Sequence, residues 1–249
     1  MMLRVRGVPA LVLICLMVGP IVGLSASAKG DPVLDFHVQF PANPGTVSYE
    51  GGAAAVIGSN IKLDTLAGFD TPLHDSSVDG PLALTGATLN FSSGLFDRVE
   101  GTTTYFGSGG DFLITGGIAD LGIAAGSILL QGTVESTELL ASGRIIVQTF
   151  VNQINAVIAT YFGLPVGTVD GDGLGTFPYI GALNLSLVSY KTDSSKAAGN
   201  FSAKAGSGDV MTSPTPEPTT LAIACLGIAM IAGHRWRKQR TFQGVRIAA

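Results

Sequence analysis

The chain has 249 residues and two cysteines, Cys15 and Cys225, which both lie in apolar terminal stretches. Residues 30–213 therefore contain no disulfide, cysteine nucleophile or cysteine-based metal site. The same residues carry 17 acidic against 6 basic side chains, a net charge of −11, which argues against nucleic acid and anionic lipid as partners.

The N-terminus has the three parts of an export signal. Arg4 and Arg6 form a positive segment, Val8–Leu24 is apolar, and Ala26-Ser27-Ala28 offers small residues at a cleavage site, with Ala26 and Ala28 as its recognised positions. We expect a signal peptide over residues 1–28 and an exported domain that begins at residue 29.

Residues 29–205 read as one all-β domain. Apolar residues alternate with polar ones, which is the pattern of a half-buried strand, and Gly-rich breaks separate the runs. This predicts a β-sandwich, jelly-roll-like or Ig-like. The apolar positions are Leu34, Phe36, Val38 and Phe40; Val47 and Tyr49; Leu89 and Phe91; and Leu183, Leu185 and Leu187.

One segment breaks the strand pattern. Its apolar residues recur at helical spacing and fall on one stripe, and Gly163 and Pro165 follow it. We expect one amphipathic helix whose apolar face packs against the domain; a helix that binds a partner is the alternative. The stripe consists of Phe150, Val151, Ile154, Val157, Ile158, Tyr161 and Phe162.

Two acidic loops are candidate calcium sites. Asp170 and Asp172 alternate with glycines, an arrangement that a hard cation accepts, and the loop Asp70–Asp79 carries Asp75 as a third acid. Calcium is the one cofactor suggested, with Asp170 and Asp172 as its ligands. Ordinary turns capped by aspartate are the alternative for both loops.

No catalytic pattern emerges. His37 and His74 are 37 residues apart. Asp97 with Glu100, or Asp170 with Asp172, supplies paired carboxylates of the kind a glycosidase uses, but acids this close in sequence are more often turn residues. We therefore expect a protein that is not an enzyme.

The C-terminal end is organised differently. A linker is expected over 206–215, followed by Pro216-Glu217-Pro218, which the prolines keep extended. Residues 219–233 are apolar and predict one transmembrane helix, about 22 Å long against a hydrocarbon core of roughly 30 Å. A basic cluster of Arg235, Arg237, Lys238 and Arg240 follows, and residues 241–249 form a cytoplasmic tail.

This order of Pro-Glu-Pro, apolar span and basic cluster resembles the PEP-CTERM sorting signal of Gram-negative bacteria, a motif also labelled an ice-binding protein C-terminal domain. The runs Gly45–Gly52, Tyr105–Gly110 and Tyr161–Pro165 resemble the exported domains of a group of such proteins. The resemblance implies that an exosortase recognises Pro216, Glu217 and Pro218 and removes the tail. The protein would then be anchored transiently in the inner membrane before it reaches the outer surface or the medium.

The expected function is a structural or adhesive role at the cell surface or in an exopolysaccharide matrix. Its partners would be the exosortase, matrix polysaccharide and, before processing, the membrane. A glycan- or ice-binding module and a secreted hydrolase are the alternatives. The single tryptophan, Trp236, lies outside the exported domain and so offers no stacking platform for a sugar there.

Overall fold

The computed structural model describes residues 33–41, 43–188, 190 and 199–214. These residues form an eleven-stranded antiparallel sheet with two short helices and a 3-10 turn, which confirms the all-β prediction. The strands are β1 (Val33–Val38), β2 (Thr46–Tyr49), β3 (Ala55–Phe69), β4 (Leu82–Ala83), β5 (Thr85–Glu100), β6 (Thr103–Phe106), β7 (Asp111–Ile118), β8 (Ile123–Leu140), β9 (Arg144–Asn155), β10 (Leu174–Val188) and β11 (Phe201–Pro214). The remaining elements are α2 (Ser76–Asp79), η1 (Ala119–Leu121) and α3 (Ala156–Phe162).

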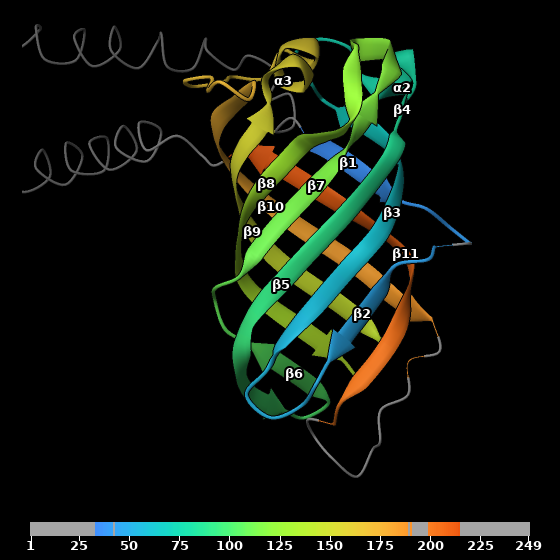
Figure 1. Cartoon of the computed structure of the whole chain (residues 1–249), viewed down its shortest axis with the longest axis vertical. Helices are drawn as coiled ribbons and strands as arrows, with labels where there is room; N and C mark the ends of the chain where they lie inside the picture. Colours follow the sequence, from blue (N-terminus) through green and yellow to red (C-terminus); the bar gives the residue numbers. More distant parts are fainter. Residues whose placement is uncertain (1–32, 42, 189, 191–198, 215–249) are drawn as a thin grey trace, which may run out of the picture.

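The sheet closes on itself, as Figure 1 shows. Going around it, β3 pairs with β5, β5 with β7, β7 with β8, and the order continues through β9, β10 and β11 to β1, which returns to β3. Two short strands complete the sheet. The strand β2 pairs with β3 and β11, and β6 pairs with β5 and β8. The expected sandwich of two sheets is therefore corrected to one closed sheet. Strand periodicity is the same in both architectures and does not reveal which strands pair.

The alternation found in the sequence defines the interior. Leu34, Phe36 and Val38 are fully buried on β1, as are Leu89 on β5 and Leu183 on β10. These side chains belong to one continuous core. Burying each large apolar side chain contributes about 1.5–3 kcal/mol to stability. The inward-facing apolar side chains therefore stabilise the closed form of the sheet.

The expected amphipathic helix is only partly correct. Phe150, Val151 and Ile154 belong to β9, and the helix α3 starts at Ala156. Asn155 caps it by accepting a hydrogen bond from the Val157 amide, and Gly163 ends it in the left-handed conformation.

The helix α3 covers one end of the closed sheet (Figure 1). Ile158, Ala159 and Phe162 are buried, so the expected packing of the helix against the core is confirmed for this part of the stripe. The Phe162 ring lies over Gly68 on β3, where a Cβ would overlap the ring. The helix therefore acts as a plug for the interior.

The expected linker over 206–215 is also corrected. The strand β11 runs to Pro214 and pairs with both β1 and β10, so this stretch completes the sheet. Its small residues have a packing reason, because a Cβ at Gly206 would lie 2.7 Å from the carbonyl oxygen of Ser186 on β10. Residue types alone do not distinguish glycines that allow close strand approach from glycines of a linker.

Several predictions lie outside the described residues. These are the signal peptide 1–28, the Pro-Glu-Pro motif, the apolar span 219–233, the basic cluster and the tail 241–249. Within the part of the chain that the structure describes, no helix is long and apolar enough to cross a membrane.

Candidate functional site

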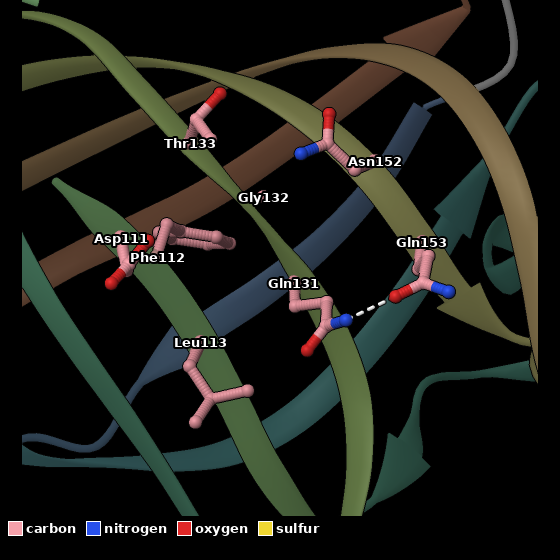
Figure 2. A pocket seen from close by; sticks show the side chains of 8 residues that line it. All are labelled: Asp111, Phe112, Leu113, Gln131, Gly132, Thr133, Asn152 and Gln153. Carbon is pink, nitrogen blue, oxygen red and sulfur yellow. Dashed lines mark hydrogen bonds between the residues drawn. The ribbon is translucent and has the colours of Figure 1, made fainter. Parts of the chain in front are cut away.

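A groove of about 380 Å³, lined by both polar and apolar residues, lies across β7, β8 and β9. Figure 2 shows the side chains that line it. Asp111, Thr133 and Asn152 are exposed, while Gln131 and Gln153 are half-buried. The complete lining is Asp111, Phe112, Leu113, Gln131, Gly132, Thr133, Asn152 and Gln153.

A β-bulge creates the polar side of this groove. Gln131 pairs with Gln153 and Gly132 pairs with Val151, so Asn152 is the extra residue on β9. Val151 and Ile154 remain fully buried on either side of it. Two consecutive polar residues, Asn152 and Gln153, are thereby placed outside the sheet, which regular alternation would forbid.

Gly132 is required by the same distortion. A Cβ at this position would lie 2.9 Å from the Cα of Val151, so only glycine lets β8 approach β9 this closely. The groove is therefore lined by backbone at this point, with Asp111 on the β7 side of Gly132 and the amide side chains of Asn152 and Gln153 on the β9 side (Figure 2).

A chain of hydrogen bonds fixes two of the lining amides. The Gln131 Nε2 group donates to Gln153 Oε1, and Gln153 Nε2 donates to Asp170 Oδ2 at 3.0 Å. Figure 2 marks one hydrogen bond among the side chains that it draws, between Gln131 and Gln153, so the side chains of Asp111, Thr133 and Asn152 make none with the other side chains drawn. The groove thus has a fixed amide pair beside three polar groups that face solvent.

Asp170 was predicted as a calcium ligand, and the structure gives its carboxylate a different set of contacts. Its Oδ1 accepts from the amides of Asp172 at 3.0 Å and Leu174 at 2.9 Å, which closes the turn between α3 and β10. Asp172 is exposed in the same turn. The described residues contain no group of three or more metal-ligating side chains.

The second acidic loop is also tied down by protein contacts. Asp75 caps α2, accepting from the amide and hydroxyl of Ser77 with one oxygen and from the Asp70 amide with the other. Asp79 lies 3.2 Å from His74 Nδ1, and the His74 ring stacks on Tyr161 of α3 at 4.1 Å. The loop therefore fastens α2 to α3.

The other candidate acids have a basic partner. Asp97 and Glu100 both bind the Arg98 guanidinium, which also lies 4.4 Å from the centre of the Tyr105 ring. This surface cluster joins β5 to β6. Asp97 and Glu100 thus lie close together as partners of Arg98.

His37 lies on the polar side of β1, as expected. Its Nδ1 is 2.8 Å from Asp209 Oδ1 on β11, and this hydrogen bond raises the pKa of His37 above its usual value. Nearby, burial and then the charge of Asp209 raise the pKa of Asp35 to about 6. His37 and His74 thus each have their own carboxylate, and the structure does not bring them together in a shared site.

Sequence reasoning missed the groove altogether. Asn152 and Gln153 lie within the segment that the apolar stripe predicts as a helix, whereas the structure places both on β9. Comparisons with family models, with curated proteins and with solved structures each found no match to this chain.

Proposed function

We propose that this protein is exported to the cell surface or the exopolysaccharide matrix and there binds polysaccharide in the groove over β7, β8 and β9, without cleaving it. The observation that carries this proposal is the lining of the groove, in which two hydrogen-bonded amides lie beside the exposed polar side chains of Asp111, Thr133 and Asn152. Amides, hydroxyls and a carboxylate are the side chains that pair with sugar hydroxyls.

The cellular context comes from the sequence. The signal-peptide pattern at residues 1–28 and the resemblance of Pro216, Glu217 and Pro218 to a PEP-CTERM signal support export and processing. A net charge of −11 over residues 30–213 is compatible with a soluble extracellular protein.

The carboxylates support a binding role without hydrolysis. Glycoside cleavage commonly uses two carboxyl groups on either side of the bond. Asp111 is the one carboxylate in the lining of the groove, and the nearby Asp170 already accepts three hydrogen bonds. A secreted hydrolase at this groove would have to work with an acid that the fold uses for other purposes.

The test is retention on matrix polysaccharide. The exported chain recovered from its producing cells should co-sediment with purified exopolysaccharide, and Asn152→Ala should reduce the bound fraction severalfold. Gln148→Ala is the matched control, because Gln148 is exposed on the same strand and does not line the groove. Equal retention of both variants would contradict the assignment of the groove as the binding site. Release of new reducing ends would show that the protein hydrolyses the polysaccharide.

A further inference from the structure

We infer that the groove presents hydrogen-bond acceptors at its fixed side, and that it therefore selects an uncharged polysaccharide that donates hydrogen bonds from its hydroxyl groups. This inference rests on the proposed binding function and names the ligand class and the residue that sets it. That residue is Asp170, which lies outside the groove lining.

The donor-to-acceptor direction of this chain of hydrogen bonds is set by Asp170. An ionised carboxylate only accepts hydrogen bonds, so Gln153 must turn its NH2 group toward Asp170 Oδ2. Gln153 Oε1 then faces Gln131, which must in turn present its own NH2 group. The chain of bonds leaves Gln131 Oε1 as the outward acceptor, and Figure 2 shows this oxygen turned away from Gln153.

The remaining lining groups narrow the ligand class. Asp111 adds a second acceptor, and no lysine or arginine lines the groove, so an anionic polymer meets repulsion without a compensating partner. Asn152 and Thr133 can donate as well as accept, so a ligand group that does both matches them better than an ammonium group, which only donates. A sugar hydroxyl donates and accepts, and so matches the whole set.

One substitution reverses the direction of the hydrogen bonds through Gln153 and Gln131 while it keeps the turn that Asp170 closes. In Asp170→Asn the Oδ1 atom still accepts from the amides of Asp172 and Leu174, which hold the turn closed. The new NH2 group replaces Oδ2 and must donate to Gln153. Both glutamine amides then rotate, and Gln131 turns its NH2 group outward. Asp170 is thus a positioning residue that acts through Gln153.

Isothermal titration of the full exported chain with three probe classes tests the inference. The probes are a panel of uncharged gluco-, galacto- and manno-oligosaccharides, chitosan oligomers as cations and alginate oligomers as anions. The wild type should bind a member of the uncharged panel at least tenfold more tightly than either charged class. Gln131→Leu should weaken that binding about tenfold, the effect of one hydrogen bond of roughly 1.4 kcal/mol, and Gln148→Leu should leave it unchanged.

The direction of the hydrogen-bond chain is tested by comparing the affinities of Asp170→Asn and the wild type for the same probes. This variant should bind the uncharged probe severalfold more weakly and alginate more strongly than the wild type, a reversal that simple loosening of the turn would not produce. If the wild type binds an uncharged probe and Asp170→Asn has the same ratio of affinities for the uncharged and charged probes, the role of Asp170 is overturned and the proposed function stands. Tightest binding of chitosan or alginate to the wild type would overturn the ligand class, and binding of no probe would contradict both proposals.

Discussion

His37 on β1 bonds Asp209 on β11, with Nδ1 and Oδ1 2.8 Å apart. The pair joins the first and last strands of the closed sheet, at the seam where β1 fits between β3 and β11. Asp35 lies on the same outer face two residues earlier, and its buried Oδ1 has no hydrogen-bond partner among the described residues. The seam therefore brings together groups whose protonation affects closure, with Asp64 of β3 as a further carboxylate that raises the pKa of His37.

The first prediction is that this seam is more stable in mild acid. The pKa of Asp35 rises from 3.8 to about 6, chiefly because of burial, so its favourable contribution is complete below pH 3.8 and is lost as the pH rises through 6. The raised pKa of His37 acts in the same direction, with a contribution that is complete below pH 6.5 and lost above it.

Urea unfolding of wild type and Asp35→Asn between pH 4 and pH 8 separates this effect from other titrations. The variant should gain about 1 kcal/mol over the wild type at pH 8 and lose that advantage toward pH 4, a figure that already discounts the shift for partial exposure. An advantage that does not change with pH would mean that Asp35 titrates normally.

The second prediction concerns hydroxyl groups inside the closed sheet. Thr149 and Thr212 flank Gly181 across three neighbouring strands, and their buried hydroxyls have no hydrogen-bond partner among the described residues. Thr149→Val and Thr212→Val should each raise the free energy of unfolding by about 1 kcal/mol, because valine has a similar shape and no polar group to desolvate. Thr46→Val, at an exposed position on β2, is the control and should be nearly neutral. A loss of stability in the buried variants would show that their hydroxyls have partners, such as an internal water.

The third prediction tests the plug. Phe162→Ala should cost about 3–5 kcal/mol, because the buried ring fills the space above Gly68 at the end of the core. Val157→Ala on the same helix should cost less than about 1 kcal/mol, since Val157 is 47% exposed. Chemical unfolding of both variants gives the comparison. Equal costs would mean that α3 does not plug the sheet through Phe162.

Single strands were easier to predict than their arrangement. Rows such as Leu34, Phe36 and Val38 were read correctly, because alternation is a local consequence of the pleat. The helix was misplaced because the bulge at Asn152 converts a period of two into a spacing of three between Val151 and Ile154, which imitates a helical stripe. The groove could not be predicted, since Gln131 and Gln153 meet only through the register of β8 on β9.

The fourth prediction concerns processing, which rests on the sequence alone. With a tag at each end, co-expression with an exosortase should remove the C-terminal tag, and Glu217→Ala should block this removal if the Pro-Glu-Pro motif is the recognition element. Immunoblots of membrane and secreted fractions provide the measurement. Equal persistence of the C-terminal tag with and without the exosortase would refute the sorting proposal.

The most direct measurement of the central claim is a nuclear magnetic resonance titration that follows the side-chain NH2 signals of the protein. On addition of an uncharged oligosaccharide that binds, the signals of Gln131, Asn152 and Gln153 should shift together and saturate with one dissociation constant, while that of Gln148 stays in place. Saturating shifts at Gln148 or elsewhere, with the three groove amides unmoved, would contradict the assignment of this groove as the binding site.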